Sequence, residues 1–323
     1  MSEKYYWLND DSRLFLERGY LDNGESPESR IRSIARTAEK ALNKEGFAKK
    51  FEEYMANGWY SLASPIWANF GKKRGLPISC FGSYIDDKME SILYTQAEVG
   101  MMSKMGGGTS AYFGKLRERG AEIKTGGKSN GPVHFMELFE TVTNIVSQSS
   151  VRRGSFAAYL DIDHPDVEEF LSIRNDGHSI QNMSFGVTIK DRWMKDMIDG
   201  DKDKRRVWGK VIKKRFESGY PYILFSDTVK KGRPEVYKDK KMNVHASNLC
   251  SEICLSTDTE NSFVCDLSSM NLLHFDEWKD TDAVETLTYF LDAVMSEFIE
   301  KAKDVPFMER TVKFAESQRA LGI

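Results

Sequence analysis

The run Asn248-Leu249-Cys250-Ser251-Glu252 carries the side chains best suited to chemistry, an amide, a thiol and a carboxylate at alternate positions. In an extended segment alternate side chains point the same way, so the three polar groups would face one substrate together. Cys250 could then act as a reactive sulfur, Glu252 as an acid or base, and Asn248 as a hydrogen-bonding group that fixes the substrate. The alternative is a strand edge with one packed thiol and two solvated polar groups, because free cysteine often behaves as a small buried hydrophobe.

Two further segments with cysteines accompany this run. Ser79-Cys80 lies far upstream, and residues 264–272, which include Cys265, follow shortly downstream. Together they resemble the large, catalytic subunit of class I ribonucleotide reductase. The resemblance extends in order from residues 12–21 to residues 318–323, and an ordered set of motifs is far more specific than a single match.

The resemblance implies a division of work among the cysteines. Cys250 matches the cysteine that becomes a thiyl radical, and Cys80 and Cys265 match the pair that supplies two electrons and closes into a disulfide. Glu252 matches the residue that takes a proton from the 3′-hydroxyl, and Asn248 the residue that holds the hydroxyl groups. The implied activity is reduction of ribonucleoside diphosphates to 2′-deoxyribonucleoside diphosphates for DNA synthesis.

The same resemblance implies contacts to the substrate. Ser64 and Ser79 match hydroxyls that touch the ribose and diphosphate, and Gly106 and Gly107 match small residues beside the base. Arg152 matches a loop residue that reaches the substrate. Without the resemblance, the Ser-Pro dipeptide at position 64 and the glycine run would both be read as turns. The glycine run is not a P-loop, which requires Gly-Lys followed by Ser or Thr, because Gly108 is followed by Thr109-Ser110 with no lysine.

A second set of charges resembles the site that binds a regulatory deoxynucleoside triphosphate or ATP. It comprises Asp86 or Asp87, Arg117, Lys124 and the loop of residues 149–155, which contains Arg152. Arginine can pair bidentately with phosphate oxygens, and a glycine-containing loop can take two conformations. Taken singly, these charges are ordinary surface groups.

Composition agrees with a large cytoplasmic enzyme. The chain has 323 residues, 40% of them hydrophobic and 29% charged, with a net charge of -3. This near-neutral balance gives no reason to expect nucleic-acid binding. The first residues lack the apolar segment of a signal peptide, no apolar run is long enough for a membrane span, and the four cysteines do not form a secreted disulfide framework.

The expected fold is α/β, with a helical domain at residues 1–60 and the first part of a barrel at residues 61–323. Ser26-Pro27 predicts a helix start, and a second helix from Phe47 should stop at Gly58. Apolar runs at 156–160 and 185–189 predict strands, and helical periodicity covers 133–147, 167–173, 207–217, 283–301 and 306–320. The resemblance implies a ten-stranded α/β barrel whose finger loop carries Cys250.

Partners follow from the resemblance as well. In the family the barrel continues beyond the segment that matches residue 323, so we expect a complementary C-terminal half, from either a split or a truncated subunit. We also expect a homodimer of the assembled subunit, a thioredoxin or glutaredoxin-type reductant, and a small subunit whose di-metal centre generates a tyrosyl radical. No metal or cofactor is expected on this chain, and no ATP-binding cone precedes Tyr5.

Three alternatives stay open. A zinc site from His245, Cys250, Cys254 and Cys265 is conceivable, although the spacings fit no usual zinc pattern and Cys254 is expected to be a packed thiol. The chain could be a non-catalytic nucleotide-binding or regulatory fragment of the same fold, although such a fragment has no chemical need for all the implied active-site residues. It could also resemble cobalamin-dependent reductases, which usually carry proline and glycine around the radical cysteine.

Overall fold

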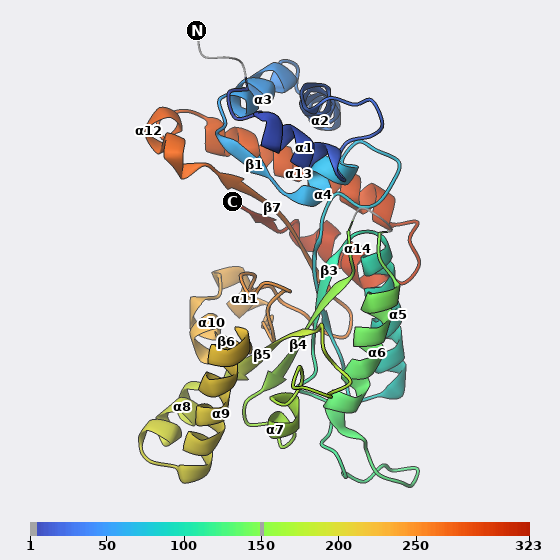
Figure 1. Cartoon of the computed structure of the whole chain (residues 1–323), viewed down its shortest axis with the longest axis vertical. Coiled ribbons are helices and arrows are strands. Elements are labelled where there is room, and N and C mark those ends of the chain that lie inside the picture. The colour runs from blue at the N-terminus through green and yellow to red at the C-terminus, as the bar shows by residue number, and fades with distance from the viewer. Residues whose placement is uncertain (1–4, 149–151) are drawn as a thin grey trace.

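The computed structural model describes residues 5–148 and 152–323, which form a helical lobe and an α/β lobe (Figure 1). The helical lobe contains α1 (Asp10–Glu17), α2 (Pro27–Leu42) and α3 (Phe47–Ala56). Helix α13 (Ala283–Ala302), although late in the sequence, packs against α2 and α3. The N-terminal helices are therefore held by a helix from the last part of the described chain.

Local signals explain where the first helices begin and end. The Ser26 hydroxyl accepts a hydrogen bond from the Ser29 backbone N–H at 3.2 Å, and the Ser29 hydroxyl accepts one from Ser26 at 3.0 Å, which forms a capping box. Helix α3 ends before Gly58, whose φ of 72° suits glycine. The predictions for both helices are confirmed.

The α/β lobe contains a curled sheet in the order β1-β7-β2-β3-β4-β5-β6. Strands β2 to β6 are parallel neighbours, whereas β7 runs antiparallel to both β1 and β2, and β8 pairs in parallel with β7. This is a half-barrel after a helical domain, so the expected fold class is confirmed. The strands are β1 (Tyr60–Leu62), β2 (Cys80–Tyr84), β3 (Gly108–Tyr112), β4 (Ser155–Asp161), β5 (Ser184–Ile189), β6 (Tyr222–Phe225), β7 (Phe263–Met270) and β8 (Leu321–Gly322).

The remaining helices connect or cover these strands, and all the helical regions predicted from periodicity are present. The predicted helix at 306–320 starts later than expected, at Glu309, because Phe307 adopts a left-handed φ of 62°. The helices are α4 (Ser64–Asn69), α5 (Met89–Lys104), α6 (Gly131–Ile145), α7 (Val167–Phe170), α8 (Asp191–Ile198), α9 (Lys202–Ser218), α10 (Ser226–Gly232), α11 (Glu235–Asp239), α12 (Phe275–Trp278) and α14 (Glu309–Gln318), with a 3₁₀ turn at Leu272–His274.

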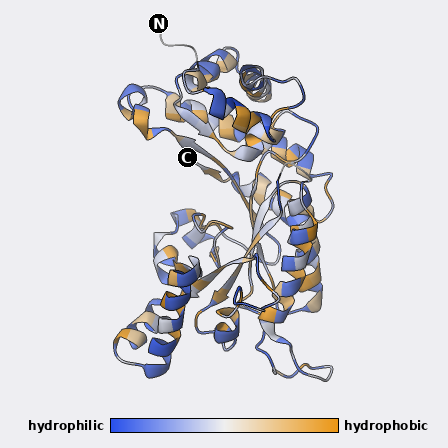
Figure 2. Cartoon of the chain, viewed as in Figure 1, coloured by the Kyte–Doolittle hydropathy of each residue, from blue (hydrophilic) through white to orange (hydrophobic). Residues whose placement is uncertain are grey.

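Two large apolar clusters form the core. One joins the helical lobe to β2 and β7, and the other fills the space between the parallel strands and helices α5, α6 and α9. The helices mix hydrophilic and hydrophobic segments, as amphipathic elements do (Figure 2). Among the residues described, no helix is long and apolar enough to cross a membrane.

Arg30 is a fully buried charge within the first cluster. Its guanidinium donates hydrogen bonds to the backbone carbonyls of Trp67 at 2.8 Å, Ile66 at 2.9 Å and Phe70 at 2.7 Å. Burial lowers the pKa of Arg30 to about 10. This side chain binds carbonyls at the end of α4, of which that of Ile66 also accepts from the Phe70 N–H at 3.1 Å, and so fixes α4 against the helical lobe.

Gly82 lies under the ring of Phe263 where β2 meets β7, and this contact gives a test of the fold. A Cβ at position 82 would lie 2.2 Å from the Phe263 ring, so Gly82→Ala should destabilise the chain by about 1–3 kcal/mol through overpacking. Gly209→Ala on α9 is the matched control, because nothing lies within 4 Å of its added methyl group. It should stabilise the helix by roughly 0.5–1 kcal/mol. Urea unfolding of both variants measures these changes, and equal stability of the two would contradict the contact.

Candidate active site

Two of the cysteines face each other across neighbouring strands. In the antiparallel pairing of β2 with β7, Cys80 lies directly opposite Cys265, and the next pair is Phe81 with Val264. Directly opposed residues of an antiparallel pair have Cα atoms roughly 4.5–5.5 Å apart, which falls within the range that a disulfide spans. Both thiols are free in the structure, Cys80 half-buried and Cys265 buried. The pair could therefore open and close without a large backbone movement.

The segment that carries Cys250 is a turn, so the expectation of an extended segment is wrong. The Ser251 N–H donates to the Asn248 carbonyl at 3.2 Å, and Ser251 has a φ of 72°. The Asn248 side-chain oxygen accepts from the Glu252 N–H at 3.0 Å and the Ile253 N–H at 3.1 Å, and its amide donates to the Glu252 carboxylate at 2.7 Å. Asn248 and Glu252 are thus brought together by direct hydrogen bonds within a turn, and not by lying on the same face of an extended strand.

Buried hydroxyls anchor this turn to the sheet. The Tyr159 hydroxyl on β4 donates to the Asn248 carbonyl at 2.7 Å, and the Ser110 hydroxyl on β3 donates to the Ser247 carbonyl at 2.8 Å. The Ser247 hydroxyl in turn donates to the Ile253 carbonyl at 2.7 Å. Sequence reasoning missed all three hydroxyls, because they lie far apart in the chain and carry no spacing signal.

The pKa shifts of the cysteines indicate that the turn lies close to the two strands. Burial, and then the Glu252 carboxylate, raise the pKa of Cys80 to about 11. Burial, and then Cys80 itself, raise the pKa of Cys265 to about 12. The pKa of Cys250 is also raised, by burial and by Glu252, while Arg152 acts in the opposite direction. Cys250 is nevertheless the exposed sulfur of the three.

Several predicted substrate-contacting residues lie beside β2. Hydrogen bonds from the Ser79 hydroxyl and the Asn248 amide act to lower the pKa of Cys80, against the larger effect of burial, so both groups lie near the sulfur. A Cβ on Gly106, whose φ is 96°, would lie 3.7 Å from the Arg152 side chain, and one on Gly107 would lie 2.6 Å from the Phe81 ring. Gly106 and Gly107 therefore allow the chain after α5 to approach β2 and the loop of Arg152.

The loop around Arg152 is only partly described. Gln148 and Arg152 form an isolated bridge, in which the Gln148 N–H donates to the Arg152 carbonyl at 3.1 Å. One buried guanidinium nitrogen of Arg152 has no hydrogen-bond partner among residues 5–148 and 152–323. Residues 149–151 of the predicted regulatory loop lie outside the described residues. Among the described residues, this Arg152 donor is therefore available to a further group near Cys250.

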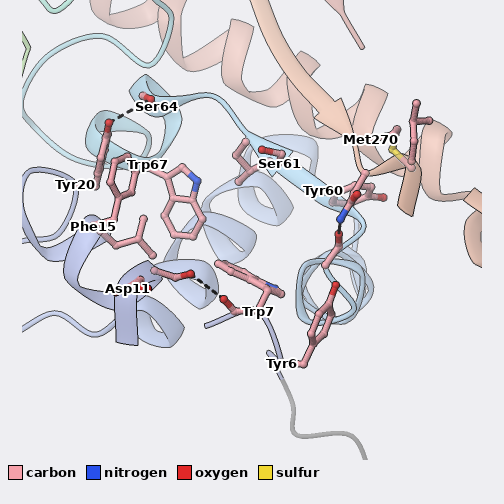
Figure 3. A pocket seen from close by; sticks show the side chains of 16 residues that line it. Tyr6, Trp7, Asp11, Phe15, Tyr20, Tyr60, Ser61, Ser64, Trp67 and Met270 are labelled. Atoms are coloured by element: carbon pink, nitrogen blue, oxygen red, sulfur yellow. Dashed lines mark hydrogen bonds between the residues drawn. The ribbon is translucent and has the colours of Figure 1, made fainter. Parts of the chain in front are cut away.

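Ser64 lies in a different place, at a cavity of about 970 Å³ between α1, β1 and the end of β7 (Figure 3). The Tyr20 hydroxyl donates to the Ser64 hydroxyl at 3.3 Å. Because Leu62 pairs with Ser268, this part of β1 lies three residues along β7 from Cys265, roughly 10 Å. The cavity is lined by aromatic and hydroxyl side chains, among them Tyr6, Trp7, Phe15, Tyr60, Ser61 and Trp67.

The predicted regulatory charges are only partly brought together. The Arg117 guanidinium binds the Asp87 carboxylate at 2.7 Å, and the Arg117 N–H donates to the same carboxylate at 3.2 Å. Asp86 pairs instead with Lys88 at 3.2 Å, and Lys124 is exposed on the following loop. Helix α5 begins immediately after these acidic residues and ends just before Gly106, so it connects them with the cysteine strands.

Cys254 is exposed, so the expectation of a packed thiol is wrong. Its neighbour Ile253 is buried, and so are Ser256 and Thr257 after it. Within residues 5–148 and 152–323, no three His, Cys, Asp or Glu side chains are grouped to hold a metal ion. The His245 ring instead packs against Tyr112 at 5.2 Å and Tyr84 at 4.9 Å between ring centroids. The zinc alternative therefore finds no support among these residues.

Comparisons with known proteins match both the helical domain and the half-barrel of this chain. Residues 6–75 match the all-alpha domain of ribonucleotide reductase, and residues 78–204 and 201–323 match its barrel domain. The structure of the Actinobacillus ureae class Id ribonucleotide reductase alpha subunit superposes with a TM-score of 0.94 and 57% identity, over 99% of this chain and 60% of that one.

Two named relatives extend the comparison. The ribonucleoside-diphosphate reductase large subunit of Invertebrate iridescent virus 3 is 30% identical, over 95% of this chain and 59% of that protein. The vitamin B12-dependent ribonucleoside-diphosphate reductase of Thermoplasma acidophilum is 28% identical, over 82% of this chain and 37% of that protein. This chain thus spans about 60% or less of the length of these three relatives. By its domain matches and its fold, the chain belongs to the ribonucleotide reductase large-subunit family.

Proposed function

We propose that this chain supplies the three reacting sulfurs of a ribonucleoside-diphosphate reductase. The observation that carries the proposal is the direct opposition of Cys80 and Cys265 on paired strands, beside a turn that presents Cys250 next to Glu252. The charges of Glu252 and Cys250 also raise the pKa of Cys80, which supports placing these three groups and Cys265 in one site. A purely structural sheet has no need for this grouping.

In the proposed reaction Cys250, once oxidised to a thiyl radical, removes the hydrogen atom from C3′ of a ribonucleoside diphosphate. Glu252 takes the 3′-hydroxyl proton, and the 2′-hydroxyl leaves as water. Cys80 and Cys265 together give up two electrons and two protons and become a disulfide. Cys250 then returns the hydrogen atom to C3′, which regenerates its radical. In net terms one ribonucleotide and two thiols become one deoxyribonucleotide, one disulfide and one water molecule.

The raised pKa values support these roles. A sulfur that exchanges a hydrogen atom must carry its hydrogen, and a raised pKa keeps the Cys250 thiol protonated at neutral pH. The same holds for Cys80 and Cys265, whose pKa values of about 11 and about 12 keep both as thiols until they are oxidised. Asn248, held by the turn, would bind the sugar hydroxyls through its remaining amide hydrogen.

Substrate and effector recognition complete the proposal. We assign Ser79, Gly106, Gly107 and Arg152 to the substrate around Cys80, and Ser64 to its diphosphate from the cavity side. Arg117, Lys124 and the acidic pair Asp86 and Asp87 would bind a deoxynucleoside triphosphate or ATP. The link between the two sites would be α5 together with the loop of Arg152.

Turnover on this scheme needs further components. The solved relative has further chain beyond the part matched here, so we propose that the rest of the barrel must be added for activity. A small subunit with a di-metal radical centre would oxidise Cys250, and a thioredoxin or glutaredoxin-type protein would reduce the Cys80–Cys265 disulfide by thiol exchange. A reducing compartment such as the cytoplasm suits free thiols.

An activity assay tests the proposal. The chain is mixed with a polypeptide carrying the rest of the barrel and with a small subunit, and reduction of cytidine diphosphate is measured. Cys250→Ala should lower the rate by about a thousandfold or more, because no other group can take the hydrogen atom. Cys254→Ala is the matched control and should stay within about twofold of the parent rate.

Three results of this assay would change the assignment. Full activity of Cys250→Ala would overturn the radical role of that residue. Binding of nucleotides without reduction in any mixture would favour the non-catalytic regulatory fragment. Activity that requires added adenosylcobalamin instead of a small subunit would place the chain with the cobalamin-dependent relatives.

Thiol alkylation tests the environments of the sulfurs. At mildly alkaline pH iodoacetamide should label the exposed Cys254 and Cys250 first and Cys265 last. Cys265 is buried, and its pKa of about 12 leaves roughly a thousandfold less thiolate than a thiol with the ordinary pKa of 9.0 would have. The rate at Cys265 should still rise roughly tenfold per pH unit above the pH at which an ordinary thiol levels off. Mass spectrometry resolves the sites, and labelling in concentrated urea is the control. Equal rates at Cys254 and Cys265 in the folded chain would contradict these environments.

Nucleotide titration tests the regulatory site. Arg117→Ala should weaken binding of deoxynucleoside triphosphates by about tenfold to a hundredfold, because it removes a charge-assisted contact to phosphate. Lys210→Ala on α9, which removes a cation paired with Glu168, is the matched control and should leave the affinity unchanged. Calorimetric titration measures both. Equal affinities of parent and Arg117→Ala would remove Arg117 from the site.

A further inference from the structure

Glu98 is a fully buried carboxylate on α5 that binds both strands of the cysteine pair. One of its carboxylate oxygens accepts hydrogen bonds from the Ser83 hydroxyl at 2.9 Å and from the Ser262 hydroxyl at 3.0 Å. Ser83 belongs to β2, and Ser262 immediately precedes β7. A single atom therefore connects two segments that lie far apart in the sequence.

The two serines lie just beyond the paired residues of β2 and β7, in the same register that places the two cysteines opposite each other. The pairs run from Cys80 with Cys265 to Gly82 with Phe263, and continuation of this register by one residue would place Ser83 opposite Ser262. Three residues of strand separate the carboxylate contact from the thiols, roughly 10 Å. Because side chains alternate, the serines point to the face opposite the thiols, toward α5. Glu98 consequently acts on the strands and not on the sulfurs.

The surroundings of Glu98 tie it to a second helix. Its other carboxylate oxygen lies 3.9 Å from the Arg310 guanidinium on α14 and has no hydrogen-bond partner among the described residues. Arg310 also donates to the Thr95 hydroxyl at 3.2 Å and lies over the Tyr94 ring at 4.3 Å from its centroid. Burying a carboxylate is costly unless it is paired, and such groups are retained in some proteins because they specify one arrangement.

We propose that Glu98 is a positioning residue that fixes the register and separation of β2 and β7, so that Cys80 and Cys265 can close into a disulfide. This rests on the proposed function of the cysteine pair. Two pairs lie between the cysteines and the serines, the apolar pair Phe81 with Val264 and the ring packing of Phe263 over Gly82. Two hydroxyls that donate to one carboxylate oxygen add a directional constraint that apolar packing lacks. A disulfide accepts only a narrow range of Cα separations, so a shift of about an ångström weakens closure.

The test measures how readily the pair closes. In a parent chain with Cys250→Ser and Cys254→Ser, only Cys80 and Cys265 remain, and the disulfide is titrated in glutathione redox buffers. Glu98→Ala, and the milder double variant Ser83→Ala with Ser262→Ala, should lower the equilibrium constant for closure by about tenfold, or about 30 mV for a two-electron couple. Glu98→Gln keeps an acceptor oxygen and should stay within about twofold of the parent.

Glu140→Gln is the matched control for a buried acid. Glu140 accepts hydrogen bonds from the backbone N–H groups of Gln181 at 3.0 Å and Asn182 at 2.7 Å, away from the cysteine strands. This variant should lose stability but leave the closure constant unchanged, which separates positioning from general destabilisation. Thermal unfolding of each variant establishes that it is folded at the titration temperature.

The outcomes distinguish the two proposals. If the pair does not close in the parent chain, the cysteine assignment itself is overturned, and the positioning role with it. If the pair closes equally well in the parent, in the double serine variant and in Glu98→Ala, only the positioning role is overturned. If Glu140→Gln shifts the closure constant as much as the serine variants do, general destabilisation explains the effect and the positioning role is again overturned.

Discussion

The antiparallel pairing of β7 with β2 is the constraint on which the rest of the site depends. The other neighbours of β2 and its successors are parallel strands joined through helices, and their order follows the chain. Strand β7 instead returns from far along the sequence and enters between β1 and β2. This one pairing places Cys80 opposite Cys265 and brings together the two serines that bind Glu98. Through β1, the other neighbour of β7, it also connects the helical lobe to the sheet.

The sequence predicted those parts of the fold that local physical chemistry dictates. Capping at Ser26, the glycine stop after α3 and the apolar periodicity of α13 need only residues that are neighbours along the chain. The type of fold followed from the family resemblance, and the half-barrel confirms it. Helix α14 begins a few residues later than predicted, because the left-handed backbone at Phe307 interrupts the helical conformation.

The family resemblance grouped the three cysteines with Asn248 and Glu252, but it gave neither their geometry nor the further residues that hold them. Alternation suggested that Asn248 and Glu252 share a strand face, yet a left-handed Ser251 folds them into a turn where side-chain and backbone hydrogen bonds join them. The contributions of Tyr159 and Glu98 depend on contacts between segments remote in sequence, and such contacts leave no periodic signal. Cys254 was expected to be packed because cysteine usually is, but its position beyond the turn exposes it.

The anchoring of the turn to β3 and β4 has a mechanical consequence. Tyr159 and Ser110 hold the Cys250 segment, whereas the other two sulfurs sit on β2 and β7, which α5 ties together through Glu98. The Cys250 segment also has a link to β2, because the Ser110 hydroxyl donates to the Phe81 carbonyl of that strand at 3.2 Å. A displacement of β2 relative to β3 would therefore act on Cys80 and on the Cys250 turn together, through a single hydroxyl group.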